Sequence, residues 1–264
     1  MDDILNKLDE VNENQPKDLV TKLINELSQS VQLFYDANDA CYAQININGV
    51  AQLWNLRSKH FNSFLGKTAL DSHKRGLNRN QREDVLSTLE AKARYEGQKL
   101  ETYRRVGQED HHILLDICCN DWNMVSCDAS GWKTLSQTKP KLVRSSGMLP
   151  LPSPSQSGDF ELLWEFLNVQ KDTDRKLITV WLLTALMPNI SYPLIVFTGE
   201  QGTAKSTATR LLRSIIDPHD SPLRTLPTKE KDLYISAHNN WVLAFDNMSG
   251  LTPTMSDALC KIAT

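Results

Sequence analysis

Residues 193–207, PLIVFTGEQGTAKST, carry the pattern that most strongly indicates the fold. Its first part, residues 194–197, is apolar and predicts a short buried strand. A glycine-containing turn follows at residues 199–204, and apolar residues at helical spacing then predict a helix that starts near Lys205. Strand, turn, Lys-Ser and helix in this order are typical of a phosphate-binding loop.

Each residue type in this loop suits the binding of a nucleotide phosphate. Glycine lets successive backbone N–H groups turn toward one phosphate, and the N-terminus of the helix adds a positive partial charge. Lys205 would contact the β- and γ-phosphate oxygens, and Ser206 would ligate Mg²⁺. The residues predicted to bind the nucleotide are Gly199, Glu200, Gln201, Gly202, Thr203, Ala204, Lys205, Ser206 and Thr207.

One position departs from the usual phosphate-loop pattern, because Ala204 stands where glycine normally precedes the lysine. The added methyl group falls in the predicted first turn of the helix, where backbone angles suit alanine. We therefore expect a tolerated variant of the loop. The alternative is a glycine-rich turn that binds nothing, and the order of the surrounding elements argues against it.

A second apolar run, residues 241–245, ends in Asp246 and Asn247. Such a run predicts a buried parallel strand with a metal-site acid at its C-terminal tip. Asp246 would hold Mg²⁺ through water, opposite Ser206. Asn247 can orient an attacking water but cannot accept its proton, so either a carboxylate such as Glu200 acts as the base or hydrolysis is slow. Lys205, Asp246 and Asn247 are the predicted catalytic residues.

The composition of the 264-residue chain is that of an ordinary globular protein, with 40% hydrophobic residues and a net charge of −3. The net charge shows no global attraction to nucleic acid. Five cysteines without a C-x-x-C pair argue against a disulfide framework or a structural zinc site. The N-terminus lacks the pattern of a signal peptide, and no apolar run is long enough to span a bilayer. We expect a cytoplasmic protein with no membrane partner.

The pattern along the chain predicts two domains. Helices are expected at residues 16–36, 58–65 and 81–95, with a hairpin of residues 41–47 and 50–56 around Asn48-Gly49 and further β-runs up to residue 135. The predicted organisation is an α+β accessory domain at 1–146, a linker at 147–158 rich in Pro, Ser and Gly, and a partial P-loop ATPase domain at 159–264. The second domain is expected to be an α/β P-loop NTPase with a parallel sheet and flanking helices.

From about residue 147 onward the chain resembles the ATPase part of phage- and plasmid-type primase-helicases, the superfamily 3 helicases of the AAA+ class. The resemblance rests on residues 199–207, 244–251 and 256–264 and covers somewhat under half of the chain. It implies ATP and Mg²⁺ as cofactors, with contacts from Lys205, Ser206 and Asp246. It also implies a role in DNA replication for a mobile element, as an oligomeric ring on DNA.

The resemblance further implies elements that would follow Thr264: a Gly-Gly turn, a basic strand facing DNA, a sensor strand and an arginine finger. The sensor strand would fill the slot between residues 194–197 and 241–246. We therefore expect a C-terminally truncated sheet with an unfilled slot, in which each unpaired buried backbone group costs about 1–3 kcal/mol. Two directly adjacent strands would instead indicate the kinase and GTPase branch.

Other candidates and functions stay open at this point. A basic-aromatic cluster is either a DNA-binding face or a solvated strand edge, and it consists of Trp132, Lys133, Lys139, Lys141 and Arg144. Arg210 and Arg213 are expected to be surface charges. The alternatives to a helicase-type ATPase are a nucleotide-binding regulatory or interaction module with little turnover, and a P-loop kinase that phosphorylates a small molecule.

Overall fold

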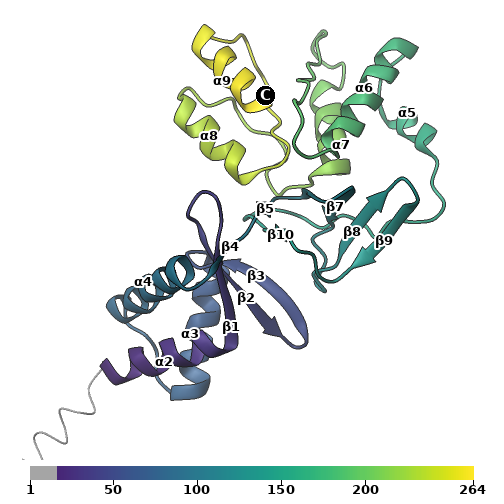
Figure 1. Cartoon of the computed structure of the whole chain (residues 1–264). Helices are drawn as coiled ribbons and strands as arrows, with labels where there is room; N and C mark the ends of the chain where they lie inside the picture. The colour runs from purple at the N-terminus through teal and green to yellow at the C-terminus, as the bar shows by residue number, and fades with distance from the viewer. Residues whose placement is uncertain (1–16) are drawn as a thin grey trace, which may run out of the picture. The chain divides into compact units, whose positions relative to one another are not determined.

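The computed structural model describes residues 17–264, which form two compact units that meet between Thr102 and Tyr103 (Figure 1). The division differs from the predicted linker at 147–158, since residues 103–146 belong to the second unit. No helix within residues 17–264 is long and apolar enough to cross a bilayer.

The first unit is a four-stranded sheet with three helices. Its elements are α2 (Lys17–Ser30), β1 (Val31–Tyr35), β2 (Cys41–Ile47), β3 (Val50–Asn55), α3 (Lys59–His73), α4 (Arg79–Tyr95) and β4 (Gln98–Lys99). The strand order is β3-β2-β1-β4, and β4 runs parallel to β1 while the other neighbours are antiparallel.

Local sequence signals explain most of these elements. The hairpin around Asn48 and Gly49 is confirmed, and both residues take positive φ values of 54° and 84°. Ser58 and Asn78 cap α3 and α4 with their side chains. The helix predicted at residues 16–36 begins outside the described residues and was placed too far toward the C-terminus: α2 ends at Ser30, and β1 follows because it pairs with β2.

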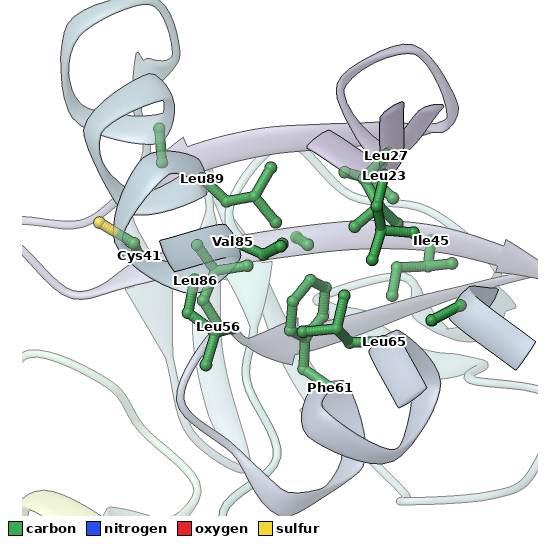
Figure 2. Close-up of a cluster of buried hydrophobic side chains, with 14 residues drawn as sticks. Leu23, Leu27, Cys41, Ile45, Leu56, Phe61, Leu65, Val85, Leu86 and Leu89 are labelled. Atoms are coloured by element: carbon green, nitrogen blue, oxygen red, sulfur yellow. The ribbon is translucent and has the colours of Figure 1, made fainter. Parts of the chain in front are cut away.

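The helices of the first unit pack on one face of its sheet and form one hydrophobic core (Figure 2). Apolar side chains recur at helical spacing in α2, α3 and α4, and alternate residues of β2 face them. The core includes Leu23, Leu27, Ala43, Ile45, Phe61, Leu65, Val85 and Leu89.

The second unit begins with a β-rich part. β5 (Thr102–Tyr103) pairs with β10 (Lys141–Leu142), and the antiparallel sheet β6-β7-β8-β9 contains β6 (Val106–Glu109), β7 (His112–Asp116), β8 (Met124–Asp128) and β9 (Gly131–Leu135). The predicted antiparallel meander is thus confirmed. β9 is an edge strand, and Trp132 and Lys133 on it are exposed.

The basic-aromatic cluster does not form one surface. Arg144 is largely buried: its guanidinium makes two hydrogen bonds of 2.8 Å to the Asp116 carboxylate and lies 3.9 Å from the ring centroid of Trp122. Lys141 is partly buried, and desolvation lowers the pKa of its ammonium. The alternative of a solvated edge therefore describes β9, while Arg144 stabilises the interior.

The rest of the second unit is helical and carries two further cores. Its elements are η1 (Phe160–Leu162), α5 (Leu163–Phe166), α6 (Asp172–Ala185), α7 (Lys205–Ile216), α8 (Glu230–Asn239) and α9 (Pro253–Ala263). One core joins α6 and α7, and the other joins α8 and α9, which lie side by side in Figure 1.

The strand predicted at residues 194–197 is not buried in the way expected. No strand is assigned there, and Leu194 and Val196 are 57% and 77% exposed, while Ile195 and Phe197 pack against the α6–α7 core. Within residues 17–264 no backbone hydrogen bond joins this segment to residues 241–246. The parallel sheet stays a prediction, and the structure has one parallel bridge in this part, between Arg224 and Phe245.

Candidate functional site

The glycine-rich loop, residues 199–204, leads directly into α7. Gly199 and Gly202 have φ values of 151° and 86°, and both positions require glycine-like backbone freedom. Ala204 immediately precedes α7 with φ 60° and ψ 24°, which is a left-handed conformation. The expectation that Ala204 has helical angles is therefore wrong: its methyl group is held where glycine is normally preferred, at a cost of about 1–2 kcal/mol.

The start of α7 presents unpaired hydrogen-bond donors. In the described part of the chain, the backbone N–H groups of residues 204–207 have no acceptor, and the first hydrogen bond of the helix runs from Ala208 N to Ala204 O at 2.9 Å. No side chain caps this end of the helix. Free N–H groups and the positive end of a twelve-residue helix together favour a bound anion.

The ammonium group of Lys205 lies over the same loop. Its Nζ donates hydrogen bonds to the carbonyl oxygens of Gly199 and Glu200 at 2.8 and 2.6 Å, and it lies 3.2 Å from the Thr203 hydroxyl. The Thr203 hydroxyl in turn donates to Glu200 O at 2.9 Å. The predicted phosphate-binding lysine is thus located at the loop, where phosphate oxygens could replace the carbonyls as acceptors.

Ser206 and Asp246 come together although 40 residues separate them, and the Ser206 hydroxyl donates a 3.0 Å hydrogen bond to Asp246 Oδ1. Two neighbouring ligands of a Mg²⁺ ion at about 2.1 Å would themselves be about 3.0 Å apart in an octahedron. The spacing of the two oxygens would therefore suit two neighbouring positions in one Mg²⁺ shell. The structure brings Ser206 and Asp246 together, and the expectation that they hold Mg²⁺, with Asp246 acting through water, stays a prediction.

The segment that carries Asp246 is held at both ends. Asp246 N donates to Arg224 O, and Arg224 N donates to Ala244 O, both at 3.0 Å. At the other end, the buried carboxylate of Asp217 accepts hydrogen bonds from the backbone N–H groups of Trp241 and Val242 at 3.1 Å. Asn247 follows Asp246 with φ 58° and is exposed, and its N–H donates to Asp246 Oδ1 at 2.8 Å.

A buried ion pair fixes Asp217. The Nε of Arg105 donates to Asp217 Oδ1 at 2.9 Å, and both side chains are almost fully buried. Arg105 comes from the β-rich part of the second unit, so this pair ties that part to the Asp246 segment. Neither residue was predicted to belong to the site, since nothing in the local pattern relates two charges 112 positions apart.

The expectation that Arg213 is a surface charge is wrong. Its side chain is buried, and Nη1 donates to the carbonyl oxygens of Ser221 and Pro222 while Nη2 donates to Asn240 Oδ1, each at 3.0 Å. Burial lowers the pKa of this guanidinium, and Asp217 partly offsets the effect. Arg213 anchors the turn between α7 and the Asp246 segment, while Arg210 is exposed as predicted.

A cavity of about 140 Å³ adjoins the glycine-rich loop. Loop residues form part of its wall, and the turn between α5 and α6 forms another part, which no sequence pattern indicated. The lining residues are Asn168, Val169, Phe197, Thr198, Gly199, Thr203, Ala204, Lys205 and Ala208. The site therefore continues beyond the loop into a concave space of mixed polarity.

Comparison with known families bears on this part of the chain. Residues 160–264 match the family described as actinomycete integrative conjugative element replication protein. The match includes the glycine-rich loop, α7 and Asp246. No curated protein matches the chain. Residues 160–264 are thus similar to a replication protein of a mobile element, which agrees with the broader part of the predicted role.

Proposed function

We propose that this chain binds ATP and Mg²⁺ through a phosphate-binding loop and hydrolyses ATP as part of a replicative DNA helicase-type enzyme. The observation that carries the proposal is the 3.0 Å contact between Ser206 and Asp246 at the N-terminus of α7, next to Lys205. A hydroxyl, a carboxylate, an ammonium and free N–H groups at one point are the groups that a triphosphate with its magnesium ion requires.

Each residue of the site would have the role that its chemistry suits. The N–H groups at the start of α7 would donate hydrogen bonds to phosphate oxygens, and Lys205 would exchange its carbonyl contacts for phosphate oxygens. Ser206 and Asp246 would hold Mg²⁺, which supplies charge neutralisation on the phosphates. Asn247 would orient a water molecule through its side-chain amide. Because an amide is not a base, the proton would go to another acceptor, for which exposed Glu200 is the candidate.

The DNA-replication part of the proposal is supported by the similarity of residues 160–264 to a mobile-element replication protein. A chain with a net charge of −3 does not attract DNA as a whole, so binding would use a local surface or several subunits together. We propose a homo-oligomeric ring as the form that acts on DNA, by the resemblance to superfamily 3 helicases.

Nucleotide binding and single-turnover hydrolysis, with and without single-stranded DNA, test this function. Wild type should bind ATP with Mg²⁺ and hydrolyse it faster with DNA. Lys205→Ala should lose binding by tenfold or more, since a charge-assisted contact contributes about 1.5–3 kcal/mol. Lys261→Ala, which removes an exposed lysine of α9, is the matched control and should behave as wild type. Absence of Lys205-dependent ATP binding would refute the proposal.

A second function, a nucleotide-binding module with little turnover, is favoured by one observation. The residue after Asp246 is Asn247, whose amide cannot take up the proton of the attacking water. Tight ATP binding without hydrolysis in the same assay, with or without DNA, would identify this module. Asn247→Glu would then be expected to raise the hydrolysis rate, because it introduces a base at this position.

A further inference from the structure

Positive charge is concentrated in one segment of the first unit. Seven of the chain's 29 Lys and Arg residues lie between residues 57 and 82, where Asp71 is the only acid. The chain as a whole carries a net charge of −3, so this segment differs in sign from the average of the protein. It comprises α3, the turn that follows and the start of α4 (Figure 1). Such a local concentration is the electrostatic footprint of a surface that binds an anionic partner.

Six of these seven cations have no carboxylate within ion-pair distance in the part of the chain that the structure describes. Arg57 is the exception, because its guanidinium lies 2.7 Å from carboxylate oxygens of both Glu83 and Glu90. The other six are exposed apart from half-buried Arg82, so they are accessible to a ligand. They form the α3 basic face, which consists of Lys59, Lys67, Lys74, Arg75, Arg79 and Arg82.

Helix α3 turns one side to the core and the opposite side to solvent. Phe61 and Leu65 are fully buried, and Figure 2 shows both pointing into the core of the first unit. At 100° per residue, Lys59 and Lys67 fall on the other side of the helix, and Lys74 follows just past its end. The helical rise puts about 12 Å between the first two lysines and about 10 Å between the second and third. The three lysines can therefore contact different phosphates of one nucleic acid.

Arg82 extends the α3 basic face onto α4. Its Nη1 donates to Asn62 O at 3.0 Å, and its Nη2 lies 3.8 Å from the position that a Cβ on Gly66 would occupy. The guanidinium thus lies on α3 next to the residue before Lys67. Arg79 is exposed one turn earlier on α4, on the same side of that helix as Arg82. Cations from two helices therefore form one surface.

The composition of this surface favours the backbone of a duplex. Lys and Arg side chains on a helix bind phosphates of double-stranded DNA without reading the bases. Surfaces that bind single strands add exposed aromatic rings on which bases stack. The exposed row of α3 has Ser63 and Leu70 between its lysines, and the neighbouring ring of His60 is already stacked on Trp54, with centroids 4.2 Å apart.

We propose that the α3 basic face binds duplex DNA through its phosphates, independently of sequence. DNA is favoured over other polyanions by the similarity of residues 160–264 to a mobile-element replication protein. The inference rests on the proposed role in DNA replication and not on nucleotide binding by the loop. It assigns DNA binding to the first unit, which lies outside the residues of that family match.

The affinity of the whole chain for a labelled duplex of about 20 base pairs, measured without ATP at several salt concentrations, tests the proposal. Six phosphate contacts predict a slope of log K against log salt of about −5. Lys59→Gln/Lys67→Gln removes two contacts, so the slope should become less steep by about 2 and the affinity at about 0.1 M salt should fall at least tenfold. Glutamine has nearly the helix propensity of lysine, so the variant should keep the circular dichroism of wild type.

Lys92→Gln/Lys99→Gln is the matched control, because it makes the same change of charge in the same unit. Lys92 lies about 20 Å along α4 from Arg79 and is paired with Glu96, and Lys99 is an exposed residue of β4. This control should keep the salt slope of wild type and its affinity within about twofold. Equal losses in the two double variants would overturn the assignment of the α3 basic face.

Two competitors test the choice of duplex DNA, single-stranded DNA of the same length and polyglutamate. Both should compete more weakly than unlabelled duplex, and equal or stronger competition by either would overturn the proposal. Absence of duplex binding, together with ATP binding that depends on Lys205, would overturn this inference and leave the nucleotide function standing. Duplex binding that is lost in Lys59→Gln/Lys67→Gln, without any ATP binding, would support this inference and refute the nucleotide function.

Discussion

Replacing Arg105 by methionine should strongly destabilise the second unit. The Arg105 side chain is fully buried, and besides its ion pair with Asp217 it donates hydrogen bonds to the carbonyl oxygens of Asp116, Leu149 and Pro218 at 2.9, 2.9 and 3.3 Å. Methionine fills much of the same volume but leaves the Asp217 charge and three carbonyls without this partner.

The magnitude follows from the penalty for a buried charge whose partner is removed, about 3–5 kcal/mol. With a urea slope of about 2 kcal/mol per M, the midpoint of unfolding would fall by about 2 M. Tryptophan fluorescence is a suitable signal, because five of the six tryptophans lie beyond residue 102. Lys176→Met, which removes an exposed ion pair with Asp172 in the same unit, should leave the midpoint unchanged.

The double variant Arg105→Met/Asp217→Asn separates the lost charge pair from lost packing. It removes the uncompensated carboxylate and should recover part of the stability that Arg105→Met loses, since deleting both partners is less harmful than deleting one. A shift of the Arg105→Met midpoint no larger than that of Lys176→Met would refute the view that this buried pair holds the Asp246 segment.

Three further predictions concern single positions. Ala204→Gly removes the strain of a left-handed alanine, which stabilises the fold by about 1–2 kcal/mol. The glycine also raises the entropy of the unfolded chain, which costs about 0.4–1 kcal/mol. Thermal unfolding should therefore shift upward by about 1–3 °C, and a lower midpoint would contradict the backbone assignment. Burial, Arg213 and Arg224 lower the pKa of His219 in the folded state, so the unfolded chain binds more protons below pH about 6.5. The stability of the fold should therefore decrease as the pH falls through that range. His219→Gln should flatten this slope in urea titrations between pH 5 and 7.5, and an unchanged slope would exclude His219 as its source. A thiol reagent should modify exposed Cys127 and Cys260 before Cys41, whose thiol is buried with a raised pKa, and mass spectrometry that finds Cys41 labelled first would contradict the packing around it.

Strong local signals predicted much of the fold. The Asn48-Gly49 hairpin and the helix after Lys205 occur where the sequence placed them, because their determinants lie within a few residues. The approach of Ser206 to Asp246 was also predicted, on the strength of two motifs whose chemistry requires a shared ion.

Features that depend on distant residues were not predictable. Arg105 and Asp217 form their pair through the tertiary fold. Arg213, which was predicted to be a surface charge, is buried because of the turn that it anchors. The conformation of Ala204 depends on how the loop enters the helix, which residue identity alone does not set. Asn168 carries no motif, and its place beside the loop follows from the packing of Leu167 and Val169.

We propose that Ser206 and Asp246 hold a magnesium ion for a nucleotide seated on the loop. The most direct measurement is the affinity for ATP with and without Mg²⁺, in wild type and in the near-isosteric variant Asp246→Asn. Mg²⁺ should tighten ATP binding by wild type, and Asp246→Asn should lose that enhancement while keeping the affinity seen without metal. An equal Mg²⁺ enhancement in both proteins would contradict the account.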